Sequence, residues 1–172
     1  MPWNSGTKRK KGYILAAGLI ILLTAADQLT KVAADRLLKF REPFVILQDI
    51  FQLEYLENRG AAFGILQNRQ EVFFLITVLA LIGLTYLYVR MPATSRYLPL
   101  KGCYVLFMAG ALGNFIDRVI RGYVIDFFYF KWINFPIFNV ADIYVTVAVI
   151  LLVVLILFYY KEEELNFVGR KK

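Results

Sequence analysis

Long uncharged segments alternate with shorter polar ones along the whole sequence. Four segments contain no Asp, Glu, Lys or Arg: residues 12–26, 72–89, 102–116 and 143–160. A helix needs about 20 residues to cross the core of a bilayer, at about 1.5 Å per residue. The pattern therefore predicts a mainly α membrane protein that forms one domain over residues 1–172. Its four transmembrane helices are expected at about residues 12–34, 70–90, 98–119 and 137–160.

The first and third uncharged segments have only 15 residues each, too few to span a bilayer alone. The first helix must continue past Asp27 toward Lys31. The third must continue past Asn114 toward Asp117 and Arg118. Ionisable groups at or just inside the membrane interface are costly, and this cost suggests a function. Composition agrees with a membrane protein, since 59% of the residues are hydrophobic, against roughly 45–50% apolar residues in soluble domains. The mean hydropathy of the chain is +0.57.

The basic residues lie near the chain ends and in one short loop rather than in a patch. They are Lys8, Arg9, Lys10 and Lys11 before the first helix, Arg90, Arg96 and Lys101 between the second and third, and Lys161, Arg170, Lys171 and Lys172 in the tail. Lys and Arg in short flanking segments tend to stay in the cytoplasm. The excess of 20 Lys and Arg over 13 Asp and Glu therefore predicts that both termini are cytoplasmic, and it does not indicate a nucleic-acid partner.

The stretch "KRKKGYILAAGLIILLTAA" also has the features of a secretory signal peptide, namely a basic region, an apolar core and small residues at its end. Three further spans follow it, and a polar signal starts at Asp27 within the same helix. We therefore expect this segment to be retained as the first transmembrane helix.

Two segments on the predicted outer side, about residues 35–70 and 120–136, are not simple loops. "FVILQDIFQLEYL" at 44–56 mixes apolar and polar positions as interfacial strands or a short amphipathic helix do. The glycines of "NRGAAFG" at 58–64 indicate a turn or a close approach, and the aromatic "RGYVIDFFYFKWINFP" suits the headgroup level. We expect a small β-rich platform on the outer membrane face and one interfacial element between the third and fourth helices.

The reactive side chains available limit the chemistry. The sequence has no histidine and one cysteine, Cys103, within an apolar run that suits a small buried hydrophobic residue. Serine occurs only as Ser5 and Ser95, both in polar flanking sequence. Catalysis by Ser-His or Cys-His pairs and zinc bound by His or Cys are therefore excluded, and any enzymatic activity must use carboxylates.

Polar residues near the helix ends all fall on the predicted outer side. They are Asp27, Lys31, Asn58, Asn114, Asp117, Arg118, Asp126, Asn139 and Asp142. Spacings of three or four residues place Asp27 with Lys31, Asn114 with Arg118, and Asn139 with Asp142 on shared helix faces. For Asp27, Lys31 and Asp117 the plainer interpretation is structural, as ion pairs and caps between helices. Likewise "AGALG" at 109–113 indicates close helix packing rather than a phosphate loop.

Asp126 and Asp142 suggest chemistry instead. Neither has a basic residue at helical spacing, both lie beside apolar or aromatic residues, and an unpaired carboxylate against lipid is expensive. Two such acids brought together share one proton, because like charges at hydrogen-bonding distance cannot both ionise. The ionised acid can activate water, while its protonated partner polarises a scissile carbonyl and later gives a proton to the leaving amine.

Five blocks occur in order: "DQLTK" at 27–31, "NRGAAFG" at 58–64, "GALGNFIDR" at 110–118, "VIDFF" at 124–128 and "FNVAD" at 138–142. In these blocks the chain resembles the lipoprotein signal peptidases, or type II signal peptidases, a family of bacterial intramembrane aspartic endopeptidases. The resemblance covers nearly the whole chain. It implies a multi-pass protein of the bacterial cytoplasmic (inner) membrane whose active site faces the outer leaflet.

By position, the resemblance implies that Asp126 and Asp142 are the catalytic dyad. Further matched positions are Asn58, Asn114, Arg118 and Asn139, which line the family's active site, Asp27 and Lys31, a supporting ion pair, and Asp117, a structural acid. The family cleaves prolipoproteins before a cysteine that bears a diacylglyceryl group, so the implied partners are such prolipoproteins and membrane lipid. No metal or organic cofactor is implied. One active site on one chain favours a monomer.

Two other functions compete with this one. A membrane phosphotransferase with carboxylate-bound magnesium would need closely spaced acids on the cytoplasmic side, where only "EEE" at 162–164 is found. A small ion-coupled transporter could use Asp27, Lys31 and Asp142 as a relay, but four spans without an evident internal repeat disfavour it.

Overall fold

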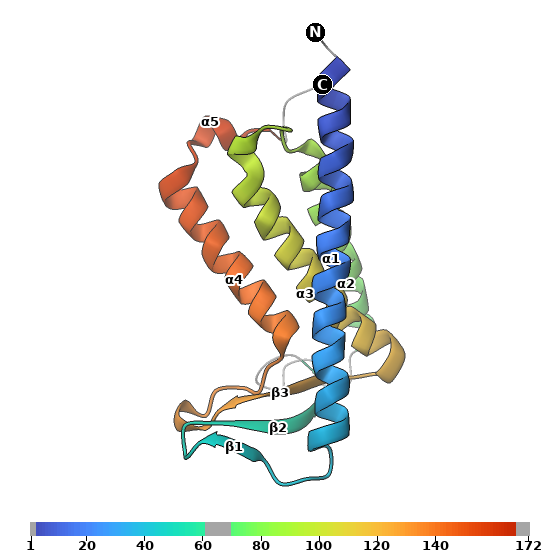
Figure 1. The fold of residues 1–172 in the computed structure, drawn as a ribbon, viewed down its shortest axis with the longest axis vertical. Coiled ribbons are helices and arrows are strands. Elements are labelled where there is room, and N and C mark those ends of the chain that lie inside the picture. The colour runs from blue at the N-terminus through green and yellow to red at the C-terminus, as the bar shows by residue number, and fades with distance from the viewer. Residues whose placement is uncertain (1–2, 61–69, 168–172) are drawn as a thin grey trace.

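The computed structural model describes residues 3–60 and 70–167, which form a group of long helices standing on a small sheet (Figure 1). The helices are α1 (Trp3–Leu38), α2 (Gln70–Arg90), α3 (Leu98–Arg121), α4 (Val140–Val154) and α5 (Glu162–Leu165), and the strands are β1 (Phe44–Leu47), β2 (Phe51–Asn58) and β3 (Val124–Phe130). Single turns of 3-10 helix cover Ser95–Tyr97 and Lys131–Ile133, and a π-helical segment, Leu155–Tyr159, extends α4.

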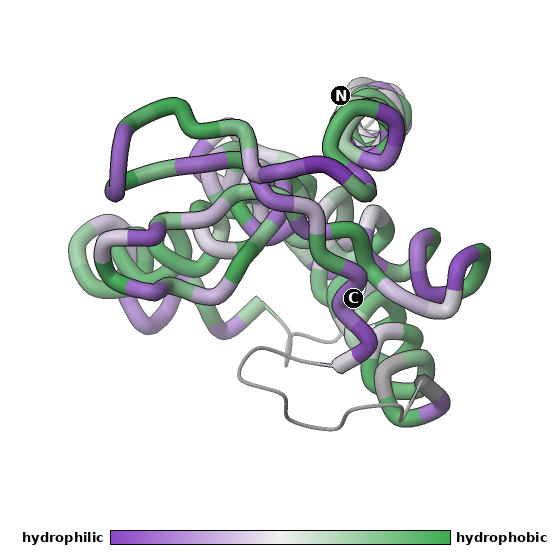
Figure 2. The backbone as a smooth tube through the Cα atoms, turned by 90° about the horizontal axis from the view of Figure 1, so that it is seen from below, coloured by the Kyte–Doolittle hydropathy of each residue, from purple (hydrophilic) through white to green (hydrophobic). Residues whose placement is uncertain are grey.

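Three helices of the described residues are long and apolar enough to cross a membrane: Arg9–Leu38, Ser95–Arg121 and Val140–Tyr159. The segment Phe74–Arg90 of α2 is a shorter apolar helix. Large apolar side chains cover their outer surfaces, and Ile14, for example, is 74% exposed. Such a surface belongs in lipid. The prediction of a mainly α membrane protein is confirmed. In Figure 2, α1 is seen end-on at the edge of the group of helices.

Three of the helices end at residues other than the predicted ones. α1 runs from Trp3 to Leu38 rather than over 12–34, because the charged residues at both its ends are mostly good helix formers. α3 continues to Arg121 and stops at Gly122, whose φ of 77° is a left-handed conformation that glycine adopts without strain. α4 starts at Val140 rather than 137, because Asn139 caps it.

The three strands form one antiparallel sheet in the order β1-β2-β3. Residues 44–56 are therefore strands rather than an amphipathic helix, and the element predicted between the third and fourth helices is mainly β3, an edge strand of the same platform. An irregularity between Leu53 and Leu56 shifts the pairing of β2 with β3. Asn58, at the end of β2, pairs with Val124, so its side chain lies near Asp126. Residues 61–64 of the predicted glycine turn lie outside the described residues.

Close packing of α3 on α4 depends on the small residues of "AGALG", as the sequence predicts. A Cβ atom added to Gly110 would lie 2.5 Å from the carbonyl oxygen of Ala141 and 2.7 Å from a methyl group of Val145. By contrast, a Cβ at Gly102 of the same helix would have no neighbour within 4 Å.

We therefore expect Gly110→Ala to lower the free energy of unfolding by about 1–3 kcal/mol, because the added methyl group overpacks the α3–α4 contact. Gly102→Ala should stabilise the protein slightly, since alanine favours helix over the unfolded chain. Thermal unfolding in detergent measures both variants. Equal unfolding temperatures for the two would show that α3 and α4 do not need this contact.

Candidate active site

Asp142 is held at the start of α4 by a reciprocal cap with Asn139. The Asn139 side chain accepts a hydrogen bond from the Asp142 backbone N–H at 3.0 Å, and the Asp142 carboxylate accepts one from the Asn139 backbone N–H at 3.1 Å. This capping box accounts for one Asp142 oxygen. The other, Oδ1, accepts a hydrogen bond from the Asn114 amide at 2.8 Å. Asp142 therefore does more than cap its helix.

Asp126 lies on β3, and the chain folds back to bring α4 next to it. After β3, Phe138 returns to pair with Phe128, through backbone hydrogen bonds of 2.8 and 3.1 Å. This pairing sets Asn139 beside Asp126. The amides of Asn58 and Asn139 donate to the two oxygens of the Asp126 carboxylate, at 2.8 and 2.6 Å respectively. Asp126 is thus buried and reached from both β2 and α4.

Two asparagines join the two acids into one network. Asn139 contacts both carboxylates, Asp126 through its side chain and Asp142 through its backbone. Its amide also donates to Oδ1 of Asn114 at 3.1 Å. Because that Asn114 oxygen also accepts from Lys31 at 2.9 Å, the amide nitrogen of Asn114 is turned toward Asp142. The network fixes the direction in which each amide points.

Behind Asn114 lies a buried ionic cluster. The ammonium group of Lys31 contacts Asp27 at 2.9 Å and Asp117 at 3.0 Å, and all three side chains are 0% exposed. With the hydrogen bond to Asn114, Lys31 therefore uses three donors on three acceptors. Arg121 pairs with the second acid, Asp117, so two cations balance two carboxylates. The ion pair of Asp27 with Lys31 that the sequence spacing predicts is present.

The same acids attach neighbouring elements to one another. Asp27 accepts the backbone N–H of Ala141 at 2.9 Å, which fixes the first turn of α4 to α1. Asp117 accepts the backbone N–H of Ile125 at 3.2 Å, which fixes β3 to α3. The cluster therefore sets where Asp126 and Asp142 stand. Sequence reasoning did not single out Gln28, which donates to both acids of the cluster at 3.2 and 3.3 Å.

A cavity of about 650 Å³ opens beside the two acids. Its polar residues include Asn58, Arg59, Asn114, Arg118, Asp126 and Asp142, and its apolar wall includes Leu56, Val124, Phe135, Ile137, Ile143 and Val147. The side chain of Arg118 also contacts the Asn114 carbonyl at 3.5 Å. Sequence reasoning did not name the residues of the apolar wall, because they come from β2, β3, α4 and the turn before α4. Only the i, i+4 spacing of Ile143 and Val147 could have indicated part of it.

Burial and the neighbouring charge of Asp142 raise the pKa of Asp126 to about 7. The amide hydrogen bonds from Asn58 and Asn139 act in the opposite direction but do not cancel the effect. Asp126 can therefore carry a proton near neutral pH. A protonated acid beside a second carboxyl group is what a pair of acids needs to protonate a carbonyl and activate water.

All nine side chains that the sequence singled out meet in this region. Asn58, Asn114, Arg118, Asp126 and Asp142 face the cavity, Asn139 links the two acids, and Asp27, Lys31 and Asp117 lie behind Asn114. Within residues 3–60 and 70–167, no group of three or more His, Cys, Asp or Glu side chains is arranged to hold a metal ion. The arrangement can perform acid–base chemistry with two carboxylates at an apolar cavity.

Comparison with known proteins decides the family. Residues 19–158 match the family model described as signal peptidase (SPase) II. The chain belongs to the signal peptidase II family. This assignment confirms the resemblance found in the five sequence blocks, and it identifies the chain as a peptidase rather than a phosphotransferase or a transporter.

Curated relatives agree with the signal peptidase II assignment. The chain is 43% identical over 141 residues to a lipoprotein signal peptidase of Streptococcus pneumoniae, covering 82% of this chain and 90% of the relative. It is 42% identical over 137 residues to one of Brevibacillus brevis, covering 80% and 89%.

A solved bacterial membrane enzyme, determined at 2.3 Å resolution, has the same fold as this signal peptidase II. It is 34% identical, with a TM-score of 0.76, and the match covers 86% of this chain and 92% of that one. The likeness therefore extends over most of both chains.

Proposed function

We propose that this signal peptidase II removes the signal peptide from diacylglyceryl-modified prolipoproteins, with Asp126 and Asp142 as its catalytic dyad. The observation that carries the proposal is the joining of these two acids through Asn139 at the wall of a largely apolar cavity. The relatives' names, lipoprotein signal peptidases, support the choice of substrate. An apolar wall suits a substrate that carries acyl chains beside the bond to be cut.

The two acids divide the work according to their surroundings. Asp142 accepts hydrogen bonds from two donors at the N-terminal end of α4, where the helix dipole favours a negative charge. Asp142 therefore acts as the base and takes a proton from water, whose oxygen adds to the scissile carbonyl carbon. Asp126 gives its proton to the carbonyl oxygen. As the C–N bond breaks, Asp142 passes its proton to the leaving amine of the lipidated cysteine, and Asp126 recovers a proton from the diol.

The remaining polar residues hold the dyad and the substrate. Asn58 and Asn139 orient Asp126, and Asn114 orients Asp142. Arg118 lines the cavity, where its guanidinium group can donate to substrate carbonyl groups. Asp27, Lys31 and Asp117 are positioning residues, because their contacts fix Asn114 and the start of α4.

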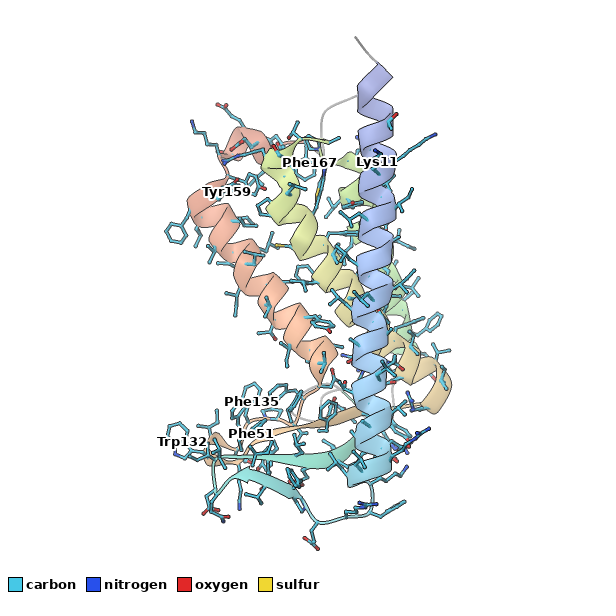
Figure 3. All side chains as sticks on the ribbon, in the orientation of Figure 1. Lys11, Phe51, Trp132, Phe135, Tyr159 and Phe167 are labelled. Carbon is cyan, nitrogen blue, oxygen red and sulfur yellow. The ribbon has the colours of Figure 1, made fainter. Side chains whose placement is uncertain are left out.

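We further propose that α1, α2, α3 and α4 all cross the bacterial cytoplasmic membrane, with both termini inside and the dyad toward the outer leaflet. In Figure 1 the N-terminus and α5 lie at the end opposite the sheet. The basic flanks favour the cytoplasm for that end. At the other end, Phe51, Trp132 and Phe135 lie at the part of the sheet farthest from α1, as suits the headgroup level (Figure 3). A single chain contributes the whole site, which supports a monomer.

The activity should depend on the proton that Asp126 holds. Because the pKa of Asp126 is raised to about 7, the group is protonated below that pH and loses its proton as the pH rises through it. We expect kcat/KM to fall above pH 7, by up to about tenfold per pH unit, as the singly protonated dyad disappears. A pH–rate profile in detergent measures this, with circular dichroism at each pH as the control for folding. A rate that keeps rising to pH 9 would contradict the assignment.

A cleavage assay tests the proposed function. The purified full-length protein is incubated with a prolipoprotein that either carries its diacylglyceryl group or lacks it. We expect loss of the signal peptide from the modified precursor only, seen as a shift on a gel, with the same rate in the presence of a chelator. Cleavage that needs added divalent metal would reject the proposed mechanism. Equal cleavage of both precursors would reject the proposed substrate.

A further inference from the structure

Arg9 joins α1 to the end of α2 without an acidic partner. Its Nε donates to the hydroxyl oxygen of Tyr13 at 2.7 Å, and a second guanidinium nitrogen donates to the backbone carbonyl of Val89. Both acceptors are neutral. The ion pairs among residues 3–60 and 70–167 include none for Arg9, so its charge is not balanced by a carboxylate there.

A second cation, Lys101, lies in the first turn of α3, three residues before Tyr104, and its side chain is half-buried. The Tyr104 ring stacks on Tyr88 of α2, whose ring lies 5.7 Å from that of Tyr13, the residue that Arg9 contacts. Lys101 likewise has no carboxylate partner in the part of the chain that the structure describes. Two like charges held close together repel each other, more strongly where water is partly excluded. A bound anion would remove this repulsion.

One acidic residue at this end of the helices, Glu164, forms an ion pair, but its partner is neither Arg9 nor Lys101. Glu164 of α5 contacts Arg96 at 2.9 Å, and the Arg96 guanidinium lies 3.9 Å from the ring centre of Tyr159. Figure 1 shows α5 between the end of α4 and the start of α3, on the side of α3 away from α1. Glu164 therefore pairs with Arg96 and not with Arg9 or Lys101.

Neighbouring tyrosine side chains indicate the depth at which Arg9 and Lys101 lie in the membrane. The rings of Tyr13 and Tyr88 lie 5.7 Å apart, Tyr88 stacks on Tyr104 at 4.1 Å, and the Tyr88 hydroxyl donates to the carbonyl of Gly12 at 3.2 Å. Tyrosine rings of this kind gather at the membrane–water interface. Arg9 precedes Tyr13 by one helical turn and Lys101 precedes Tyr104 by nearly one, so both cations lie at the level of lipid phosphates.

We propose that Arg9 and Lys101 bind the phosphate of an anionic phospholipid of the cytoplasmic leaflet. The proposal rests on the proposed membrane orientation but not on the proposed dyad. The cytoplasmic leaflet is rich in anionic lipid, and basic pockets between helices on that side bind such headgroups. A phosphodiester accepts hydrogen bonds from both a guanidinium and an ammonium group. The bound lipid would hold α1, the end of α2 and the start of α3 together.

Native mass spectrometry of the full-length protein in a non-ionic detergent tests this site. The probes are phosphatidylglycerol and phosphatidylcholine with identical acyl chains, and inorganic phosphate serves as a third probe. We expect the wild type to retain one phosphatidylglycerol selectively. Arg9→Gln and Lys101→Gln should each weaken that binding about fivefold, the effect of one cation near the surface. Lys11→Gln is the matched control, because it removes an exposed basic residue two positions from Arg9.

Unchanged binding by Lys11→Gln together with loss in the other two variants supports the site. Equal losses in all three variants would overturn it, since the attraction would then be that of any basic flank. Equal retention of the two lipids, or equal binding of inorganic phosphate, would also overturn it. Should Arg9→Gln unfold because it loses the Val89 contact, Lys101→Gln decides alone. Prolipoprotein cleavage, assayed on the same samples, reports the proposed function separately.

Discussion

Replacing either dyad acid with asparagine should abolish turnover. We expect Asp126→Asn and Asp142→Asn each to lower kcat by about a thousandfold or more, because each removes a group that carries a proton in the reaction. Asparagine keeps the size of aspartate and can still take part in the amide network. The double variant should be no slower than the slower single one, since the two acids act as one unit. Product formation under single-turnover conditions measures these rates.

Two controls keep this result interpretable. Thermal unfolding of each variant should stay close to that of the wild type, because asparagine has nearly the size and shape of aspartic acid. Glu57→Gln changes an acid at the rim of the same cavity, paired with Lys39 and Arg59, and should retain activity. Turnover within tenfold of wild type by either single variant would remove that acid from the dyad.

Loss of the buried cation should have the largest effect on stability. Lys31→Met keeps the length of the side chain but leaves two buried carboxylates with one cation, Arg121. Breaking a buried ion pair by removing one partner typically lowers the free energy of unfolding by about 3–5 kcal/mol. We expect a loss of this size in chemical or thermal unfolding. Activity should fall as well, because Asn114 loses the contact that turns its amide toward Asp142.

The matched control is Lys39→Met, at an exposed ion pair beside the sheet. Lys39 contacts Asp35 at 3.6 Å and Glu57 at 3.1 Å, and all three side chains are at least 26% exposed. Such a pair contributes about 1 kcal/mol at most. Adding Asp27→Asn and Asp117→Asn to Lys31→Met should restore part of the lost stability, since no unpaired acid is then buried. An equal effect of Lys31→Met and Lys39→Met would contradict the buried cluster.

Much of the fold could be predicted because a bilayer constrains sequence strongly. Uncharged lengths located the helices, and the spacing of Asp27 with Lys31 correctly indicated an ion pair on one helix face. The strand β3 was harder to predict, because "VIDFFYF" is equally compatible with an interfacial segment and with an edge strand until its partner is known. The partner, β2, lies more than 60 residues earlier, and pairing at that distance leaves no local sequence signal.

In the candidate site, too, contacts between residues far apart in the sequence could not be predicted. The identity of the acids followed from the absence of histidine and from the resemblance, and their convergence followed from helix orientation. The amide network could not be predicted, because the directions of Asn114 and Asn139 depend on three elements meeting at one point. Gln28 was overlooked for a related reason. A glutamine next to an aspartate carries no special pattern until a second acid, Asp117, is known to lie opposite.

Intact-mass measurement of the products from one diacylglyceryl-modified prolipoprotein tests the dyad most directly. The wild-type protein should yield two fragments whose masses place the cut immediately before the lipidated cysteine, with one water added. Under the same conditions Asp142→Asn, folded and at equal concentration, should leave the precursor mass unchanged. The same two fragments from Asp142→Asn at a comparable rate would contradict the account.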